Sequence, residues 1–381
     1  MELNELRAQM DETDGKLLEM FVRRMELSSQ IAQYKKTKNL PVQDLKRERE
    51  KLVSVAQAVP EELRDYASGL YAMLFEISRS YQNRLLGTYS ALSERVNQAL
   101  ENTPKIFPDY EAVACQGIEG ANSHSACLKL FPHANTMFFS SFEAVFTATE
   151  KGLCRYGIVP VENSTVGSVT QVCDLMMRHR FSIVRSVRLR VSHDLLAKPG
   201  TKLEDIREIY SHQQAISQCS RFLSELKNVR VIPCENTAVA ARLAATSEEK
   251  GVAAIASPEC LRYYPLSCVQ AGVQNTNDNY TRFICISRDL EIYPGADRTS
   301  LMLTLPHEPG ALCRLLNGIY ALDINLVKLE SRPLPGHSFE FMFYFDLEVP
   351  VYSHKLTQLL NELPGACDSF TYLGSYSEVP E

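Results

Sequence analysis

Several features that define whole classes of protein are missing from this 381-residue sequence. No run of about eighteen apolar residues occurs, so no membrane-spanning helix is expected. The first residues lack the basic region and apolar core of a secretion signal, and we expect a cytoplasmic protein. The net charge is -6, so neither nucleic acid nor a membrane surface is an expected partner. Any anionic ligand must therefore be bound by a local cluster of basic residues.

Cysteine is absent from the first hundred residues, and no Cys-x-x-Cys pair occurs anywhere. The 11 cysteines are odd in number and scattered from Cys115 onward. This pattern argues against a disulfide framework and against a zinc site. We expect reduced thiols, no bound metal and no cofactor.

Residues 1–88 contain few helix breakers and carry the apolar spacing of long helices. Helices are predicted over 3–37, 44–57 and 61–85, and the last could continue toward Leu100. The first would be about 50 Å long at ~1.5 Å per residue. An all-α domain of this size cannot bury a helix of that length by itself. We therefore expect a partner chain to cover it.

Beyond Pro104 the pattern changes, and strand-like and helical stretches alternate over 109–289, which predicts an α/β domain. Expected strands there include 156–161, 182–189 and 252–257, and expected helices include 141–150 and 238–245. After a break at 293–295, strands are predicted over 299–305, 325–331, 339–347 and 370–374, and helices over 310–321 and 353–362. This βαββαβ order predicts an α+β, ferredoxin-like domain over 298–378, and hence a multidomain chain.

Basic residues punctuate the first helical segment at Arg7, Arg24, Lys35 and Arg47. Arg24 and Lys35 point within about 20° of each other on a helix, whereas Arg7 points roughly 100° away. Two more polar pairings lie on helix faces: Asp44 with Arg47 and Glu48, and Ser78 with Gln82. These faces could form a cationic pocket for a dianion, although the charge pattern alone favours a solvated surface.

The same eight residues stand in the order and spacing of the all-helical chorismate mutases, and Pro41–Glu50 resembles a sequence motif of that family. The resemblance implies an intertwined dimer that rearranges chorismate to prephenate. It assigns the substrate carboxylates to Arg7, Arg24 and Ser78, the ether oxygen to Lys35 and Gln82, and the ring hydroxyl and pocket wall to Asp44, Arg47 and Glu48. Gln82 is neutral at any pH, so we expect activity near neutrality. We also predict that Arg7 serves the site of the neighbouring chain.

Four short motifs between 115 and 283 are each typical of a turn or helix cap when taken singly. They are Gly117–Ser123, Pro160–Gly167, Ser211–Gln218 and Asn279–Phe283. Together they resemble the prephenate dehydratases, whose two α/β lobes are shaped like periplasmic binding proteins. The resemblance implies loss of the ring hydroxyl and ring carboxylate of prephenate, which yields phenylpyruvate.

For this second reaction the resemblance makes Thr281 the proton donor. The residues implied to bind prephenate are Ser123, Glu162, Asn163, Ser164, Gln218, Thr281, Arg282 and Phe283. The Arg282 side chain could polarise the cleft, or it could hold the loop of this motif in place. His212 is a rival acid, although a hydrogen bond in a turn is its favoured role. Asn122 stands where many relatives have tyrosine, which changes the rim of the pocket.

Two motifs of the last segment, Glu308–Leu312 and Glu330–Pro333, resemble those of ACT regulatory domains. The resemblance implies a phenylalanine site at a subunit interface and feedback inhibition. Its residues would be Gly310, Ala311, Leu312, Glu330, Ser331, Arg332 and Pro333.

Taken together, the resemblances cover nearly all of the chain and imply two enzyme activities in phenylalanine biosynthesis. Chorismate and prephenate are the expected substrates, L-phenylalanine the expected effector, and a homodimer or higher oligomer the expected assembly. Two alternatives remain open. One is a mutase fused to a cleft that has lost catalysis, and the other is a ligand-binding sensor.

Overall fold

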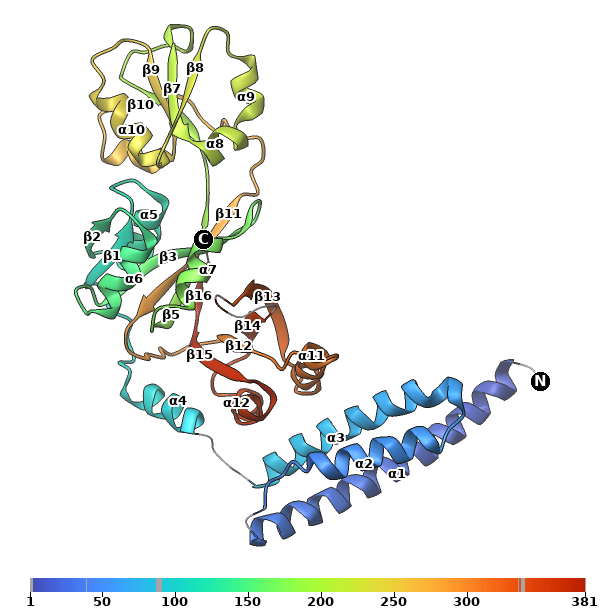
Figure 1. Ribbon diagram of the computed structural model, residues 1–381. Coiled ribbons are helices and arrows are strands. Elements are labelled where there is room, and N and C mark those ends of the chain that lie inside the picture. The colour runs from blue at the N-terminus through green and yellow to red at the C-terminus, as the bar shows by residue number, and fades with distance from the viewer. Residues whose placement is uncertain (1–2, 39, 87–90, 335, 337–339, 381) are drawn as a thin grey trace. The chain divides into compact units, whose positions relative to one another are not determined.

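The computed structural model describes residues 3–38, 40–86, 91–334, 336 and 340–380 (Figure 1). The chain divides into two compact units. One contains Met1–Gln98 and Met302–Thr371, and the other contains Ala99–Leu301 and Tyr372–Glu381. Within the described ranges, no helix combines the length and apolarity needed to cross a bilayer.

The first unit begins with a cluster of long helices. They are α1 (Leu3–Lys38), α2 (Leu45–Gln57) and α3 (Arg64–Leu86), with a 3-10 turn η1 (Glu61–Leu63) before the last. Both α1 and α2 pack on α3, as Figure 1 shows. The three predicted helices are confirmed. A separate helix, α4 (Ala91–Asn102), occupies the stretch toward Leu100, and residues 87–90 lie outside the described part of the chain.

α1 leaves most of its apolar side chains in contact with solvent within a single chain. Over its 36 residues only Ser28 and Ala32 are buried. The exposed apolar residues of its first two-thirds are Leu3, Leu6, Met10, Leu17, Leu18, Met20 and Val22. Exposed apolar surface of this extent on one helix is typical of an interaction surface.

The second unit contains two sheets, which confirms the predicted two-lobed α/β architecture. The first has the strand order β16-β5-β11-β3-β1-β2, with β4 beside β3. Its strands are β1 (Ala112–Gln116), β2 (Asn135–Phe139), β3 (Tyr156–Asn163), β4 (Gly167–Ser168), β5 (Ser182–Arg190), β11 (Tyr280–Ser287) and β16 (Glu378–Val379). The helices of this lobe are α5 (Asn122–Leu130), α6 (Phe142–Glu150) and α7 (Thr170–Met176). Its core includes Phe131, Tyr156 and Ile158, all fully buried.

The second sheet has the order β10-β6-β9-β7-β8. Its strands are β6 (Asp194–Ala197), β7 (Glu208–His212), β8 (Arg230–Cys234), β9 (Val252–Ala256) and β10 (Ser267–Gln270). Its helices are α8 (Gln213–Gln218), α9 (Ser220–Glu225) and α10 (Thr237–Thr246), with the 3-10 turns η2 (Leu203–Asp205) and η3 (Pro258–Arg262). The chain crosses between the sheets after β5 and returns before β11. The Val191 N–H donates to the Asn279 carbonyl oxygen at 2.7 Å and joins the two crossings.

The last sheet has the order β13-β14-β12-β15. Its elements are β12 (Arg298–Thr304), α11 (Ala311–Ala321), β13 (Asn325–Pro333), β14 (Phe341–Glu348), α12 (His354–Ala366) and β15 (Ser369–Tyr376). The predicted βαββαβ order is therefore observed. The predicted third strand was to begin at Phe339, which lies outside the described residues. β13 forms one edge of this sheet.

Two candidate active sites

The first candidate site is formed where α1 meets α3. The Arg24 guanidinium donates to the Leu74 carbonyl oxygen at 3.0 Å and to the Ser78 hydroxyl, and lies 5.9 Å from the centre of the Phe75 ring. Burial lowers the pKa of Arg24 from its ordinary value, yet a guanidinium stays charged near neutrality. The structure therefore brings together two predicted residues, Arg24 and Ser78, that are far apart in sequence.

A buried amide lies beside this arginine. Gln82 Nε2 donates to the Ser28 hydroxyl at 2.9 Å, and both side chains are buried. Gln82 Oε1 is buried too, and no hydrogen-bond partner for it exists among the described residues. Buried polar atoms in native proteins are normally satisfied, so this amide suits a polar ligand. Ser28 was not predicted, although it lies four residues after Arg24 on the same helix face.

Lys35 and Glu48 extend the cluster toward α2. The half-buried Lys35 ammonium donates to the Val42 carbonyl oxygen in the turn between α1 and α2. Glu48 forms an ion pair with Arg79 of α3, which also pairs with Glu76. Arg79 was missed from the sequence, although it is the neighbour of the predicted Ser78.

Three predicted residues of this site stay at the surface. Asp44 precedes α2 and caps it by accepting the Arg47 backbone N–H at 3.0 Å, so it does not share a helix face with Arg47 and Glu48 as expected. The correction follows from local chemistry, because a carboxylate at an N-cap satisfies an otherwise free N–H. The Arg47 side chain is 76% exposed. Arg7 is exposed and forms no hydrogen bond or ion pair with the described residues.

The second candidate site begins at the antiparallel pair β3–β11. The register of this pair sets Thr281 opposite Asn163 and Arg282 opposite Glu162. Asn163 Nδ2 donates to Thr281 Oγ1 at 2.9 Å. Because this hydroxyl oxygen accepts, its own proton is available to another acceptor.

Further amides and hydroxyls continue from this pair. Asn163 Nδ2 also donates to Asn279 Oδ1 at 2.7 Å, and Asn279 Nδ2 donates to Gln218 Oε1 at 3.2 Å. Gln218 Nε2 lies 3.3 Å from Thr165 Oγ1. The predicted Asn163, Gln218 and Thr281 are thus joined in one network. Asn279 and Thr165 were not predicted as site residues, although both lie inside the motifs that indicated the site.

Arg282 and Phe283 support the strand that carries Thr281. Arg282 is buried, and its Nη2 atom lies 3.5 Å from a carboxylate oxygen of Glu162. Phe283 is 2% exposed and belongs to the apolar core of the lobe. Phe283 therefore packs in the core of the lobe, and its contact with prephenate stays a prediction.

Ser164 lies in a loop after β3, whereas Ser123 lies in helix α5. The Ser164 hydroxyl donates to the Asp278 carbonyl oxygen and accepts the Tyr280 N–H, both at 2.9 Å, so it closes the loop beside β11. Ser123 is buried in the first turn of α5. In the described part of the chain, no hydrogen bond links Ser123 to Thr281.

His212 has the structural role that the sequence favoured. It caps α8, where its Nδ1 atom accepts the Gln214 N–H at 3.3 Å. This bond occupies the ring nitrogen in a helix cap.

The C-terminal motifs lie at a helix start and on an edge strand. Gly310 has φ 81° and precedes α11, a backbone conformation that glycine adopts without steric cost. Ala311 and Leu312 open that helix, while Glu330, Ser331, Arg332 and Pro333 end β13.

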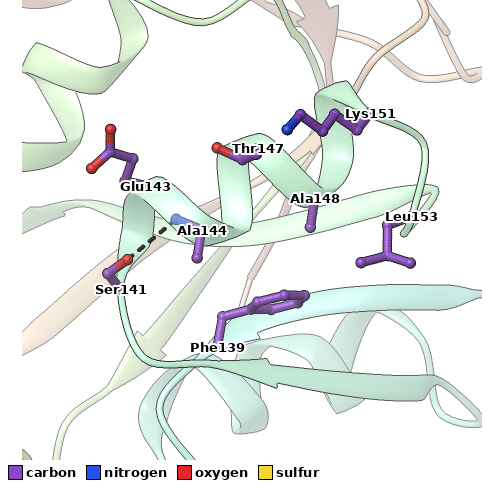
Figure 2. A pocket seen from close by; sticks show the side chains of 8 residues that line it. All are labelled: Phe139, Ser141, Glu143, Ala144, Thr147, Ala148, Lys151 and Leu153. Atoms are coloured by element: carbon purple, nitrogen blue, oxygen red, sulfur yellow. Dashed lines mark hydrogen bonds between the residues drawn. The ribbon is translucent and has the colours of Figure 1, made fainter.

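A separate hollow is formed by β2 and α6 (Figure 2). It contains Phe139 and Leu153 beside the polar Glu143 and Lys151. The hydrogen bond drawn in Figure 2 is a helix cap, in which the Ala144 N–H donates to Ser141 Oγ at 3.2 Å. None of the predicted site residues lines this hollow, so we do not assign it a ligand.

Two family models match the chain: chorismate mutase type II over residues 6–83 and prephenate dehydratase over residues 113–291. A bifunctional chorismate mutase/prephenate dehydratase from Aquifex aeolicus (strain VF5) is 31% identical over 381 residues, covering 99% of this chain and 98% of that protein. This chain belongs to the bifunctional chorismate mutase/prephenate dehydratase family. The two resemblances inferred from the sequence are thereby confirmed.

Other relatives of this bifunctional family share its dehydratase part. Arogenate dehydratase/prephenate dehydratase 2 from Arabidopsis thaliana is 34% identical over 314 residues, covering 79% of this chain and 80% of that protein. The crystal structure of a prephenate dehydratase from Arthrobacter aurescens in complex with L-Phe is 28% identical, with a TM-score of 0.64. That match covers 70% of this chain and 89% of the Arthrobacter chain.

Proposed function

We propose that this enzyme converts chorismate to prephenate in the helical site and prephenate to phenylpyruvate in the two-lobed site. The observation that carries the proposal is the match to a bifunctional relative along 99% of the chain, together with a polar cluster at each implied site. We divide the chain into a mutase domain (1–88), a dehydratase domain (109–289) and an ACT domain (298–378). The first range contains the matched mutase segment, 6–83, and the second contains all of the matched dehydratase segment, 113–291, except its last two residues.

The mutase reaction needs a substrate held in a reactive shape and a stabilised ether oxygen, without acid–base chemistry. Arg24, supported by Ser78, binds one carboxylate of chorismate. Lys35 and the Gln82 amide donate to the ether oxygen as negative charge develops there. Glu48, held by Arg79, accepts from the ring hydroxyl, and the exposed Arg47 and Asp44 border the pocket.

In the dehydratase reaction, the bond between the ring and its carboxylate breaks, and the electrons enter the ring as carbon dioxide leaves. The bond between the ring and its hydroxyl breaks in turn, and that oxygen takes a proton from Thr281 and leaves as water. Water then reprotonates the threonine. Asn163 orients Thr281 by donating to its oxygen. Gln218, Ser164 and Ser123 bind the remaining carboxylate and keto group, and the Glu162–Arg282 pair holds the strand.

Supplying chorismate to the purified protein tests this proposal. Phenylpyruvate is the expected product. Prephenate alone would show a mutase fused to an inactive cleft, and no turnover would favour a binding sensor. A parallel assay with arogenate, which the Arabidopsis relative is named for, tells whether the dehydratase also accepts the amino analogue of prephenate.

L-Phenylalanine is the proposed effector of the C-terminal domain. The solved Arthrobacter relative was crystallised with L-Phe, which supports the assignment. The start of α11, at Gly310, Ala311 and Leu312, suits the carboxylate of an amino acid. The end of β13 (Glu330, Ser331, Arg332, Pro333) completes the site. Added L-phenylalanine should bind in calorimetry and reduce dehydratase turnover, and binding without any change in turnover would contradict feedback control.

A homodimer is the proposed assembly, with α1 covered by the partner chain. The exposed apolar residues of α1 support it, as does a hollow along this helix lined by Gly15, Leu18, Glu19, Met20, Val22, Arg23 and Glu26. Arg7 lies about 25 Å along α1 from Arg24 at ~1.5 Å per residue, too far to share one small pocket. Arg7 therefore completes the mutase site of the partner.

Mixed dimers of two inactive variants test the shared site. Arg7→Ala and Arg24→Ala should each be inactive alone. After joint refolding, a mixed dimer places both defects in one site and leaves the other intact, so partial mutase activity should return. Native mass spectrometry with one labelled variant establishes that mixed dimers formed. A mixture that contains them and stays inactive would refute the shared site.

A further inference from the structure

His193, another histidine of the dehydratase region, lies on the crossing between β5 and β6. Its side chain is buried, with 3% of the residue exposed. Its backbone is held on both sides by the returning crossing: its N–H donates to Gln274 Oε1 and its carbonyl oxygen accepts the Val273 N–H, both at 2.9 Å. Its Nε2 atom lies 3.0 Å from Gln218 Oε1. An immobilised imidazole therefore contacts a residue proposed to bind prephenate.

The orientation of each amide in the network follows from its fixed backbone neighbours. Asn163 Oδ1 accepts the backbone N–H groups of Thr165 and Val166, both at 3.1 Å. Its Nδ2 must then face Asn279 Oδ1, at 2.7 Å. Asn279 Nδ2 in turn faces Gln218 Oε1, at 3.2 Å. The oxygen of Gln218 is thus directed toward Asn279 and toward the histidine.

This orientation determines the protonation of His193. A carbonyl oxygen only accepts, so Nε2 must carry the hydrogen, and a ring lacking it would set two lone pairs against each other. Nδ1 is buried without a hydrogen-bond partner among the described residues. Burial lowers the pKa of His193 from its ordinary value, against the opposing effects of Gln218 and Asp194. The orientation of Gln218 therefore makes Nε2 of the ring the donor in this contact.

Fixing the oxygen of the Gln218 amide also fixes its nitrogen, Nε2. Its Nε2 carries two hydrogens, and one of them is directed at Thr165 Oγ1, 3.3 Å away. Within the described chain, no hydrogen bond uses the other. The partly exposed amide therefore keeps one N–H for a ligand, provided that its oxygen stays where the histidine holds it.

We propose that His193 is a positioning residue of the dehydratase: its Nε2–H holds the Gln218 oxygen and so presents the remaining Gln218 N–H to the pyruvyl carboxylate of prephenate. This role rests on the proposed dehydratase function. The carboxylate is charged both before and during the reaction. Loss of the histidine should therefore weaken ground-state and transition-state binding equally.

Two substitutions separate this role from simple packing. H193L fills similar space without a donor, and should raise the KM for prephenate by about 10-fold with kcat changed by less than about threefold. H193Q places an amide nitrogen near the Nε2 position and should recover most of the lost affinity. A merely structural role would lower the amount of active enzyme, and hence the apparent kcat, while KM stayed constant.

Three controls make the outcome decisive. Circular dichroism and thermal unfolding show whether the dehydratase region of each variant is folded, because mutase turnover reports on the other compact unit. H179L is a matched control. His179 lies in the first lobe of the dehydratase region and pairs with Glu150 at 2.8 Å, so its removal should leave the KM for prephenate unchanged. In a Q218L background, H193L should have little further effect, because its partner is gone.

The KM measurements and the activity of the unmodified protein test two different proposals. An unchanged KM in H193L, or an equal loss from H193L with and without Gln218, would overturn the role of His193 alone. Failure of the unmodified protein to convert prephenate would instead refute the proposed dehydratase function.

Discussion

The polar cluster on α1, α2 and α3 combines charged side chains with neutral ones, whereas the hydrogen-bonded network that joins Asn163, Thr281, Asn279 and Gln218 consists of neutral amides and hydroxyls. Arg24 and the Arg79–Glu48 pair belong to the first, and Asn163, Gln218 and Thr281 to the second. Fixed charges suit a rearrangement in which charge only has to be stabilised. A directed network of neutral donors suits a reaction in which a proton must be delivered.

The two regions also differ in how they bury apolar surface. Among the described residues of 3–86, the buried hydrophobic residues are Ala32 and Val55. The first lobe of the dehydratase region alone buries Phe131, Tyr156 and Ile158 completely. The proposed dimer would therefore matter more for the stability of the helical region than for that of the two-lobed region.

Substitution at Thr281 should have the largest effect and should affect one region only. Thr281→Ala removes the proposed proton donor, so kcat with prephenate should fall by about 10²- to 10⁴-fold. Thr281→Ser keeps the hydroxyl and should retain more of the activity. Steady-state rates with prephenate measure both variants. Mutase activity in the same protein should stay normal, and a parallel loss of both reactions would show a folding defect instead.

Gln82→Glu should make mutase activity depend on pH, whereas the neutral Gln82 is expected to keep it constant near neutrality. A glutamate can donate to the ether oxygen only when protonated, and its ordinary pKa is about 4.3. Activity should therefore be present at low pH and fall as the pH rises through the pKa of the carboxyl. The unmodified enzyme should show no such loss near neutrality. A variant with a flat pH profile would contradict donation by this side chain.

Shortening an apolar side chain should have a different effect in each region, and the difference should appear when the protein concentration is varied. Ile158→Ala removes a fully buried side chain and should lower the free energy of unfolding of the dehydratase region by about 2–5 kcal/mol at any concentration. Leu17→Ala alters a side chain that is 61% exposed in one chain. It should weaken dimerisation, so its effect should appear on dilution. Denaturant titrations at two protein concentrations distinguish the cases.

The smallest effect is expected at an exposed ion pair. Lys16 and Glu12 lie 2.7 Å apart on α1, with side chains 72% and 69% exposed. Glu12→Ala should change the free energy of unfolding by less than about 0.5 kcal/mol. A larger loss would mean that this part of α1 is buried against the partner chain.

Much of the helical site was predictable because helical spacing is local. Residues three, four, seven or eleven positions apart share a face, so Arg24 and Lys35 could be placed on one side of α1 from the sequence. The same spacing would have found Ser28. Asp44 was misplaced because a capping bond to Arg47 competes with the helix face.

The second site was predictable only as a set of motifs. Nothing local connects Asn163 with Thr281, which are 118 residues apart and meet through the register of β3 with β11. His193 carried no signal at all, since a lone histidine after a strand is usually structural. Its contact with Gln218 becomes visible only in the folded chain, where the crossing that carries it lies beside the returning one.

The sequence by itself determined the helices, the alternation of strands and the families whose motifs the chain carries. These depend on interactions within a few residues and on residue types in a fixed order. The tertiary structure alone decided which polar groups meet, which way their amides face and which apolar face of α1 is left open. Those outcomes depend on contacts between residues far apart in the chain, and no periodicity records them.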